Sequence, residues 1–225
     1  MNLPRLRNFI LGLMPVWQLA AVDAPAQTTH SGVFESEILA FERADKARPP
    51  SHHPILFTGS SSIRKWTSLA RDFKGHHVIN RGFGGSQMSD LVYYADRIVI
   101  HYQPQQIIFF SGSNDLDAGK TPRQVFNDFK AFVQKVRAAL PNVEMDYISI
   151  TTSPLRWREV DEVKKANTLI SSWIKTQEHL TFIDVFPATL GEDGRPKPEY
   201  FVADGLHMNA RGYALWTKIV EPYLK

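Results

Sequence analysis

Residues 55–66 read ILFTGSSSIRKW, a short apolar run that ends in a glycine and three serines. Consecutive apolar residues of this kind are typical of a strand that is buried on both faces of a sheet. A string of serines is usually a solvated loop, but here an isoleucine and a tryptophan follow it closely. The stretch therefore predicts a buried strand that turns directly into a helix, with hydroxyl groups at the turn.

Four more apolar runs of this kind follow along the chain, each four to six residues long and rich in Ile, Val, Phe or Tyr. Together with residues 55–58 they predict five strands. The later runs cover residues 77–80, 106–111, 145–150 and 181–185.

Helical patterns lie between the apolar runs. The clearest begins at Thr121-Pro122, a capping residue followed by a proline at the first helical position, and carries an apolar stripe as far as Pro141. Others cover residues 163–174 and the segment from Asn209 onward. Strands that alternate with helices predict right-handed βαβ units and a mostly parallel sheet covered on both faces.

A chain of 225 residues suits a single domain, and no repeat or linker divides it. Segment 187–199 is rich in Pro and Gly and predicts the longest irregular loop. In a doubly wound sheet the ligand site lies beyond the carboxyl ends of the strands. The residues directly after each strand are therefore the candidates for function.

Composition excludes several classes of function. The chain has no cysteine, which excludes disulfides, thiolate catalysis and cysteine-based zinc sites. The formal charge is only +3 and no Lys/Arg run occurs, so we expect no nucleic-acid binding. The pairs His52–His53 and His76–His77 lack the helical spacing of a metal site and favour surface or loop positions, so we expect no metal.

The first 26 residues resemble an export signal. Arg5 and Arg7 precede the apolar run FILGLMPVWQLAAV, and Ala24-Pro25-Ala26 forms an A-x-A-like cleavage site. The run is shorter than the ~20 residues of a spanning helix. Without a cysteine to carry a lipid at the new terminus, a bacterial-lipoprotein anchor is excluded, so we expect no stable membrane anchor. We expect residues 1–26 to be removed, which leaves a periplasmic or secreted protein with one domain at 27–225. The alternative is an amphipathic tail on a cytoplasmic protein.

Polar and small residues gather after four of the five predicted strands. They are found at residues 59–62 (GSSS), 80–86 (NRGFGGS), 112–115 (GSND) and, past the long loop, 204–207 (DGLH). Because the carboxyl ends of parallel strands meet at one edge of the sheet, we expect these segments to lie together.

Acyl transfer is the chemistry that needs these residue types together. A serine hydroxyl becomes a nucleophile when a histidine takes its proton, and the histidine needs an orienting carboxylate, as Asp204 and His207 could supply. The negative oxygen of the tetrahedral intermediate needs preorganised donors. Gly85 could offer a backbone N–H, Asn114 a side-chain amide, and the nucleophile its own N–H at the start of a helix.

Each segment alone also has a simpler interpretation. GSSS could be a phosphate-binding turn, GFGG an ordinary tight turn and Asn114 a helix cap, and D-x-x-H often arises by chance. All four in order, each after its own strand, are hard to explain as turns. G-x-S-x-G does not occur, so the nucleophile elbow of α/β-hydrolases is not predicted.

These segments resemble the sequence blocks of the SGNH hydrolases, also called GDSL-type esterases and lipases. The first block, usually Gly-Asp-Ser, is similar to Gly59-Ser60-Ser61, and the others correspond to INRGFGG, GSND and DGLH. The resemblance implies a flavodoxin-like three-layer α/β/α sandwich with a five-stranded parallel sheet. It also implies ester hydrolysis without metal or other cofactor.

The resemblance also assigns roles at the site. In its register Ser61 is the nucleophile and belongs to a triad with His207 and Asp204, while Ser60 replaces the usual aspartate, which is not a triad member. The oxyanion hole would comprise Ser61, Gly85 and Asn114. Ser62 is expected to cap the following helix.

The expected partner is a small-molecule ester, because five strands and their helices leave little chain for a lid. Short or modest acyl groups, including those of acetylated carbohydrates, would suit such an open site. Phe83, Trp157 and Leu206 are candidate apolar walls, although Trp157 could equally pack in the core or a loop. The alternatives are a lysophospholipase or thioesterase on the same site, or a non-catalytic carbohydrate-binding module.

Overall fold

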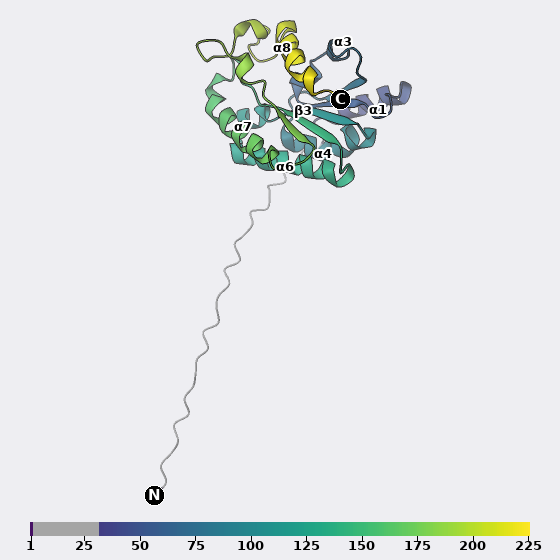
Figure 1. The fold of residues 1–225 in the computed structure, drawn as a ribbon, viewed down its shortest axis with the longest axis horizontal. Coiled ribbons are helices and arrows are strands. Elements are labelled where there is room, and N and C mark those ends of the chain that lie inside the picture. Colours follow the sequence, from purple (N-terminus) through teal and green to yellow (C-terminus); the bar gives the residue numbers. More distant parts are fainter. Residues whose placement is uncertain (2–31) are drawn as a thin grey trace.

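The computed structural model describes Met1 and residues 32–225. Apart from Met1, the predicted signal peptide at residues 1–26 lies outside the described residues. Five parallel strands form one sheet in the order β2-β1-β3-β4-β5, and helices cover both of its faces (Figure 1). All five predicted strands are confirmed, each within two residues at either end. They are β1 (Ile55–Gly59), β2 (Val78–Gly82), β3 (Gln106–Phe110), β4 (Glu144–Ile148) and β5 (Leu180–Ile183).

The helices divide into two layers, as the predicted α/β/α sandwich requires. One face of the sheet packs against α1 (Glu35–Ala47), α4 (Met88–Ile98), α6 (Pro122–Ala139) and α7 (Val160–Ile174). The other face packs against α2 (Ser61–Arg64), α3 (Leu69–Asp72) and α8 (Ala210–Val220).

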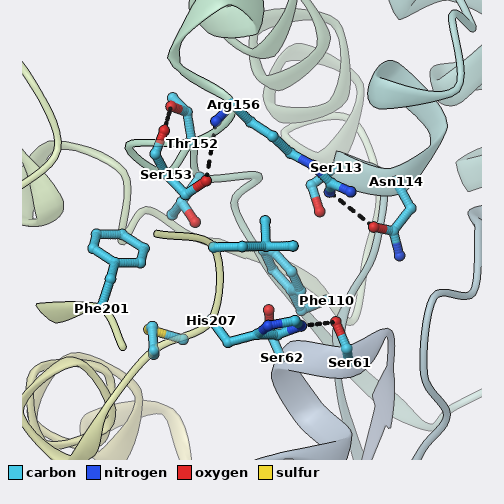
Figure 2. Close-up of a pocket in the computed structure, with 13 residues that line it drawn as sticks. Ser61, Ser62, Phe110, Ser113, Asn114, Thr152, Ser153, Arg156, Phe201 and His207 are labelled. Atoms are coloured by element: carbon cyan, nitrogen blue, oxygen red, sulfur yellow. Dashed lines mark hydrogen bonds between the residues drawn. The ribbon is translucent and has the colours of Figure 1, made fainter. Parts of the chain in front are cut away.

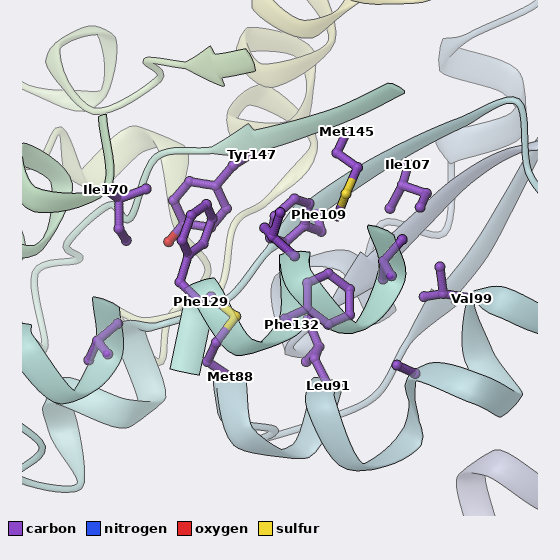
Figure 3. Close-up of a cluster of buried hydrophobic side chains, with 14 of the residues drawn as sticks. Met88, Leu91, Val99, Ile107, Phe109, Phe129, Phe132, Met145, Tyr147 and Ile170 are labelled. Atoms are coloured by element: carbon purple, nitrogen blue, oxygen red, sulfur yellow. The ribbon is translucent and has the colours of Figure 1, made fainter. Parts of the chain in front are cut away.

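Successive strand residues contribute to opposite cores, as the two-residue period of a strand requires. Phe109 of β3 packs with Phe129 and Phe132 of α6 and with Tyr147 of β4, at ring-centroid distances of 5.8, 5.0 and 5.0 Å (Figure 3). Its neighbour Phe110 belongs to the core on the other face. The sheet is therefore buried on both sides.

The second core brings α8 onto the segment that follows α2. Trp66 stacks on Tyr213 at 5.2 Å and meets the edge of Trp216 at 6.0 Å. The Tyr213 hydroxyl donates a hydrogen bond to the carbonyl of Ser62 at 3.0 Å. Residues of α8 thus support the short helix that follows β1.

The long helix α6 begins as the sequence predicts. The Thr121 hydroxyl accepts a hydrogen bond from the backbone N–H of Gln124, and the Gln124 side chain accepts one from the N–H of Thr121. Pro122 occupies the first turn, where its missing N–H costs no helical hydrogen bond. The cap fixes where this helix begins.

Segment 187–199 is more ordered than the predicted loop. It starts with a 3₁₀ turn, η3 (Pro187–Thr189), and Leu190 and Pro196 then form an antiparallel bridge. A second turn, η4 (Pro198–Tyr200), ends the segment. Backbone hydrogen bonds therefore shape the approach to residues 204–207.

Two glycines allow close packing at the carboxyl ends of β1 and β2. Gly59 has φ +135°, and a Cβ on it would lie 1.9 Å from the carbonyl oxygen of Phe110. A Cβ on Gly82 would lie 2.4 Å from the backbone nitrogen of Arg64 in α2. Asn80 completes the contact, since its Nδ2 donates to the carbonyl of Ile63 at 2.6 Å. These contacts hold α2 directly above the ends of β1 and β2.

Candidate active site

Ser61 is the first residue of α2, directly beyond the end of β1. Ser60 occupies the N-cap position of this helix, but its side chain makes no capping hydrogen bond. Ser60 is almost fully buried. The prediction that Ser62 caps the helix is wrong, because Ser62 lies inside it. As the first helical residue, Ser61 has a backbone N–H with no partner inside the helix, so this N–H can bind another acceptor.

His207 lies between Ser61 and Asp204 (Figure 2 shows the contact with Ser61). Its Nε2 is 3.1 Å from the Ser61 hydroxyl, and its Nδ1 is 2.6 Å from Oδ2 of Asp204. An ionised carboxylate only accepts hydrogen bonds, so Nδ1 carries the ring proton. In the neutral ring, Nε2 is then the acceptor that faces the serine hydroxyl.

The Asp204 carboxylate is held at both oxygens. Oδ1 accepts hydrogen bonds from the backbone N–H groups of Leu206 and His207, at 2.8 and 2.9 Å. The hydrogen bond from the His207 ring, followed by those from the backbone, lowers the pKa of Asp204 well below its usual range. The carboxylate therefore stays charged while it orients the imidazole.

The loop that carries Asp204 and His207 is anchored to the molecule on two sides. Val202 donates its N–H to the carbonyl of His207 at 2.9 Å, and Leu155, which follows β4, donates to the carbonyl of Gly205 at 3.0 Å. The imidazole is largely enclosed, with 17% of its side chain exposed. These contacts limit the movement of His207 relative to the sheet.

Asn114 lies in α5 (Ser113–Asp117), directly after β3. Its Nδ2 donates to the carbonyl of Ser86 at 2.9 Å, and its Oδ1 accepts from Nη1 of Arg156 at 2.8 Å. Gly112, not Asn114, is the N-cap of α5, so the interpretation of Asn114 as a helix cap does not apply. The side-chain amide is instead held between two loops.

Gly85 lies in the turn between β2 and α4 and has φ +78°. Among the described residues its N–H has no hydrogen-bond acceptor. Gly85 does not line the pocket at Ser61 and His207, but the next residue, Ser86, receives the amide hydrogen bond of Asn114. The structure thus brings the two predicted donor segments into contact.

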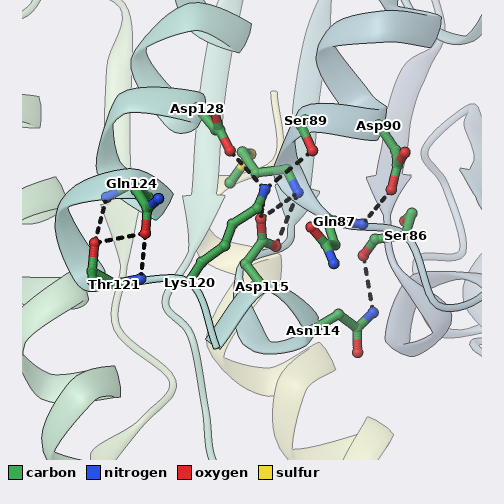
Figure 4. A network of polar contacts seen from close by, with 11 residues as sticks. Ser86, Gln87, Ser89, Asp90, Asn114, Asp115, Lys120, Thr121, Gln124 and Asp128 are labelled. Atoms are coloured by element: carbon green, nitrogen blue, oxygen red, sulfur yellow. Dashed lines mark hydrogen bonds and ion pairs between the residues drawn. The ribbon is translucent and has the colours of Figure 1, made fainter. Parts of the chain in front are cut away.

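A buried carboxylate, that of Asp115, joins α5 to the start of α4 (Figure 4). Asp115 has no exposed side-chain surface, and it accepts hydrogen bonds from the N–H of Met88 at 3.0 Å and from Nζ of Lys120 at 2.9 Å. Burial raises the pKa of Asp115, and Lys120 and the Met88 N–H oppose that rise. Lys120 also binds Asp128 at 2.8 Å. The network fixes α5, which carries Asn114, relative to the turn that carries Gly85.

The cavity beside Ser61 and His207 is small, with a volume of about 30 Å³. Leu206 lines it, as the sequence predicts. The expectation for Phe83 is corrected: this ring is fully buried and packs against Phe34 and Tyr94, because the turn directs it into the core. Trp157 does not line the cavity either.

Sequence reasoning missed the part of the cavity that follows β4. Thr151, Thr152, Ser153 and Arg156 line it there, and three of these four residues carry hydroxyl groups (Figure 2). The rule that found the other segments, that functional residues follow strand ends, applies equally to this strand. Apolar surface comes mainly from Phe110, Phe201, Leu206 and Met208.

In the part of the chain that the structure describes, no three His, Cys, Asp or Glu side chains are placed to hold a metal ion together. A search of the helices in the same part finds none with the length and apolar character needed to cross a bilayer.

Comparison with known proteins gives a family match and many similar folds. The model of the GDSL-like lipase/acylhydrolase family matches residues 51–215. A search of curated proteins finds no match.

Three solved structures illustrate the shared fold. A protein from Streptococcus pneumonia, whose name refers to platelet activating factor, is 23% identical; the alignment covers 84% of this chain and 92% of that one, with a TM-score of 0.76. A GDSL-like lipase from Bacteroides thetaiotaomicron is 18% identical, with coverages of 84% and 97% and a TM-score of 0.70. An acetyl esterase mutant solved with an acetate ion is 16% identical, with coverages of 76% and 95% and a TM-score of 0.58.

Proposed function

Because the chain belongs to the GDSL-like lipase/acylhydrolase family, we propose that it hydrolyses carboxylic esters of short acyl chains through an acyl-enzyme on Ser61. The observation that carries the proposal is the hydrogen-bonded series from Ser61 through His207 to Asp204, with distances of 3.1 and 2.6 Å. A serine hydroxyl in contact with an oriented imidazole has the general base that it needs to attack an ester.

The first half of the reaction forms the acyl-enzyme. Ser61 Oγ attacks the ester carbonyl carbon while Nε2 of His207 takes the hydroxyl proton. The charged Asp204 stabilises the resulting imidazolium, and the N–H groups of Ser61, Gly85 and Asn114 would bind the oxyanion. When the tetrahedral intermediate collapses, the bond to the alcohol oxygen breaks, and His207 gives its proton to that oxygen.

The second half releases the acid. Water attacks the acyl carbon of the Ser61 ester, and His207 accepts a proton from this water. The second tetrahedral intermediate collapses with cleavage of the bond to Ser61 Oγ, to which His207 returns the proton. A carboxylic acid leaves, and the resting serine and neutral imidazole are restored.

The size and lining of the cavity support small acyl groups. A volume of about 30 Å³ leaves little room beside the serine, whereas pockets that enclose drug-sized ligands have volumes of ~300–1,000 Å³. The hydroxyl-bearing residues Thr151, Thr152 and Ser153 line this space. A polar lining of this kind would suit a polar ester such as an acetylated saccharide. The fold shared with an acetyl esterase is consistent with this substrate class.

An ester panel of graded acyl length tests the proposal. We expect kcat/KM to be highest for p-nitrophenyl acetate and to fall steadily toward the octanoate, with acetylated xylose or glucose also cleaved. A preference for long acyl chains, lysophospholipids or acyl thioesters would replace the short-ester proposal. Saccharide binding without turnover of any ester would indicate a non-catalytic binding module.

We also propose that residues 1–26 direct export, because they combine a charged start, a short apolar run and an A-x-A-like site. N-terminal sequencing of native protein should find a chain that begins near Gln27. A native protein that retains residues 1–26 would contradict export.

A further inference from the structure

We propose that Arg156 is a positioning residue of the oxyanion hole, because it holds the Asn114 amide in the one orientation that presents an N–H to the substrate oxygen. The inference rests on the proposed ester hydrolysis. It concerns a residue that follows β4 and that the catalytic mechanism above does not use.

The contacts of Asn114 fix which end of its amide faces which neighbour. Nη1 of Arg156 can only donate, and it lies 2.8 Å from Oδ1 of Asn114. The carbonyl of Ser86 can only accept, and it lies 2.9 Å from Nδ2. A flip of the amide would oppose donor to donor and acceptor to acceptor. The two neighbours together therefore select one orientation.

This orientation leaves one donor available. The Nδ2 group carries two N–H bonds, and one of them is used by Ser86. No other described residue accepts a hydrogen bond from Nδ2. Asn114 lines the cavity that also contains Ser61 and His207, so the second N–H can serve an oxygen bound there. Without Arg156 the amide would lose the contact that holds Oδ1 away from the substrate.

Arg156 is itself held in place. Its Nη2 donates to Oδ2 of Asp117 at 2.8 Å, its backbone N–H donates to the Ser153 hydroxyl at 3.3 Å, and 14% of its side chain is exposed. The carboxylate of Asp117 balances the charge of the guanidinium. Because of this pairing, Arg156 is poorly suited to recognise an anionic substrate. The contacts favour a fixed support for Asn114 over a flexible substrate-binding arm (Figure 2).

The charge of Arg156 also matters for the reaction. A cationic donor at Oδ1 polarises the amide, which makes the N–H at its other end a stronger donor. This effect grows as the substrate oxygen becomes negative, so it favours the transition state over the bound ester. The loss of Arg156 should therefore lower kcat and leave KM nearly unchanged.

The kinetic test compares Arg156→Ala with Arg158→Ala on p-nitrophenyl acetate. Arg158 also binds Asp117, at 3.2 Å, but its side chain is 76% exposed and it makes no contact with Asn114. We expect Arg156→Ala to lower kcat by about tenfold or more, but by less than the ~10²–10³ of a lost oxyanion donor, and to leave KM within about twofold. Arg158→Ala should be near wild type. Thermal melts of both variants check that they fold.

Combination with Asn114→Ala separates positioning from an independent role. If Arg156 acts through Asn114, Arg156→Ala should cause no further loss of kcat in the Asn114→Ala protein. Multiplicative losses, a kcat for Arg156→Ala within about threefold of wild type, or a change confined to KM would each overturn the inference.

A measurement without turnover keeps the inference separate from the proposed function. In ¹⁵N-labelled protein, the side-chain NH₂ signals of Asn114 are identified by their absence in Asn114→Ala. They should shift or broaden in Arg156→Ala and stay unchanged in Arg158→Ala. Unchanged signals in both variants would overturn the inference. If the signals respond but wild-type protein hydrolyses no ester, the contact holds, and the proposed function and the catalytic role of Arg156 both fail.

Discussion

Nε2 of His207 lies 3.1 Å from Oγ of Ser61, although 146 positions separate the two residues in the chain. The contact joins the first turn of α2 to the loop before α8. Three serines follow one another at this turn. Ser60 is buried at the N-cap position, whereas the hydroxyl of Ser61 contacts the imidazole of His207.

Replacement of the nucleophile should abolish turnover. Ser61→Ala removes the hydroxyl that forms the acyl-enzyme, so kcat on p-nitrophenyl acetate should fall by up to ~10⁶, as in other serine hydrolases that lose their nucleophile. Ser60→Ala is the matched control, and it should retain activity because its hydroxyl makes no contact with His207. A Ser61→Ala enzyme with near-normal kcat would show that the site has been misplaced.

Covalent labelling tests the same residue directly. A fluorophosphonate should form one adduct, on Ser61, detected by mass spectrometry of the digested protein. His207→Ala should react far more slowly, since no base activates the hydroxyl. An adduct on Ser60 or Ser62 would assign the nucleophile to another residue of the turn.

Loss of the Asn114 side chain should affect the rate more than the stability. Asn114→Ala should lower kcat by ~10²–10³, equivalent to about 2.7–4 kcal/mol of transition-state stabilisation. Because Gly112 caps α5, the loss cannot be explained by an uncapped helix. Steady-state kinetics and urea unfolding on the same preparation measure both effects, and a kcat within about threefold of wild type would exclude Asn114 from the oxyanion hole.

The pH profile should show one ionisation on its acid side. The proposed base can accept the serine proton only while Nε2 of His207 is unprotonated, so kcat/KM should fall on the acid side and reach a plateau at higher pH. Hydrogen bonds lower the pKa of Asp204, so its stabilising contribution is complete above the ordinary aspartate range and is lost only as pH falls through the lowered value. A second acid step near pH ~4 would contradict this assignment of Asp204.

Removal of Lys120 should destabilise the fold. Lys120→Met leaves the fully buried carboxylate of Asp115 without its cation, and the break of a buried pair costs ~3–5 kcal/mol. Lys165→Met is the control, because Lys165 pairs with Glu162 on an exposed helix surface, where water screens the pair and its loss should change the stability little. Urea unfolding gives both values, and equal effects would contradict the importance of the buried pair.

The strands and the main helices could be predicted from the sequence because their signals are local. Apolar runs mark strands buried on both faces, and the Thr121-Pro122 cap marks the start of α6. The parallel order then places the segments after the strands at one edge, which brings Ser61 and Asn114 to the same cavity. Most observed strand ends differ from the predicted ends by one or two residues, because backbone hydrogen bonds define where a strand ends and the amino-acid composition does not.

Side-chain direction could not be predicted in the same way. Phe83 follows a strand and was expected at the site, but the turn directs its ring into the core. Arg156 occupies the site although no motif marks it, because its role depends on contacts with Asn114 and Asp117, which are distant in sequence. Ser62 is not the predicted cap, because α2 begins at Ser61, two residues earlier than a cap at Ser62 requires.

The packing of Trp66 against Tyr213 and Trp216 has a consequence for biosynthesis. While the ribosome is still translating, β1 and α2 emerge long before α8, and the indole of Trp66 then lacks the two rings that cover it in the finished fold. His207, the proposed general base, emerges just ahead of α8. A nascent chain should therefore lack the proposed activity and expose an aromatic surface to chaperones until residues 210–220 have left the ribosomal tunnel.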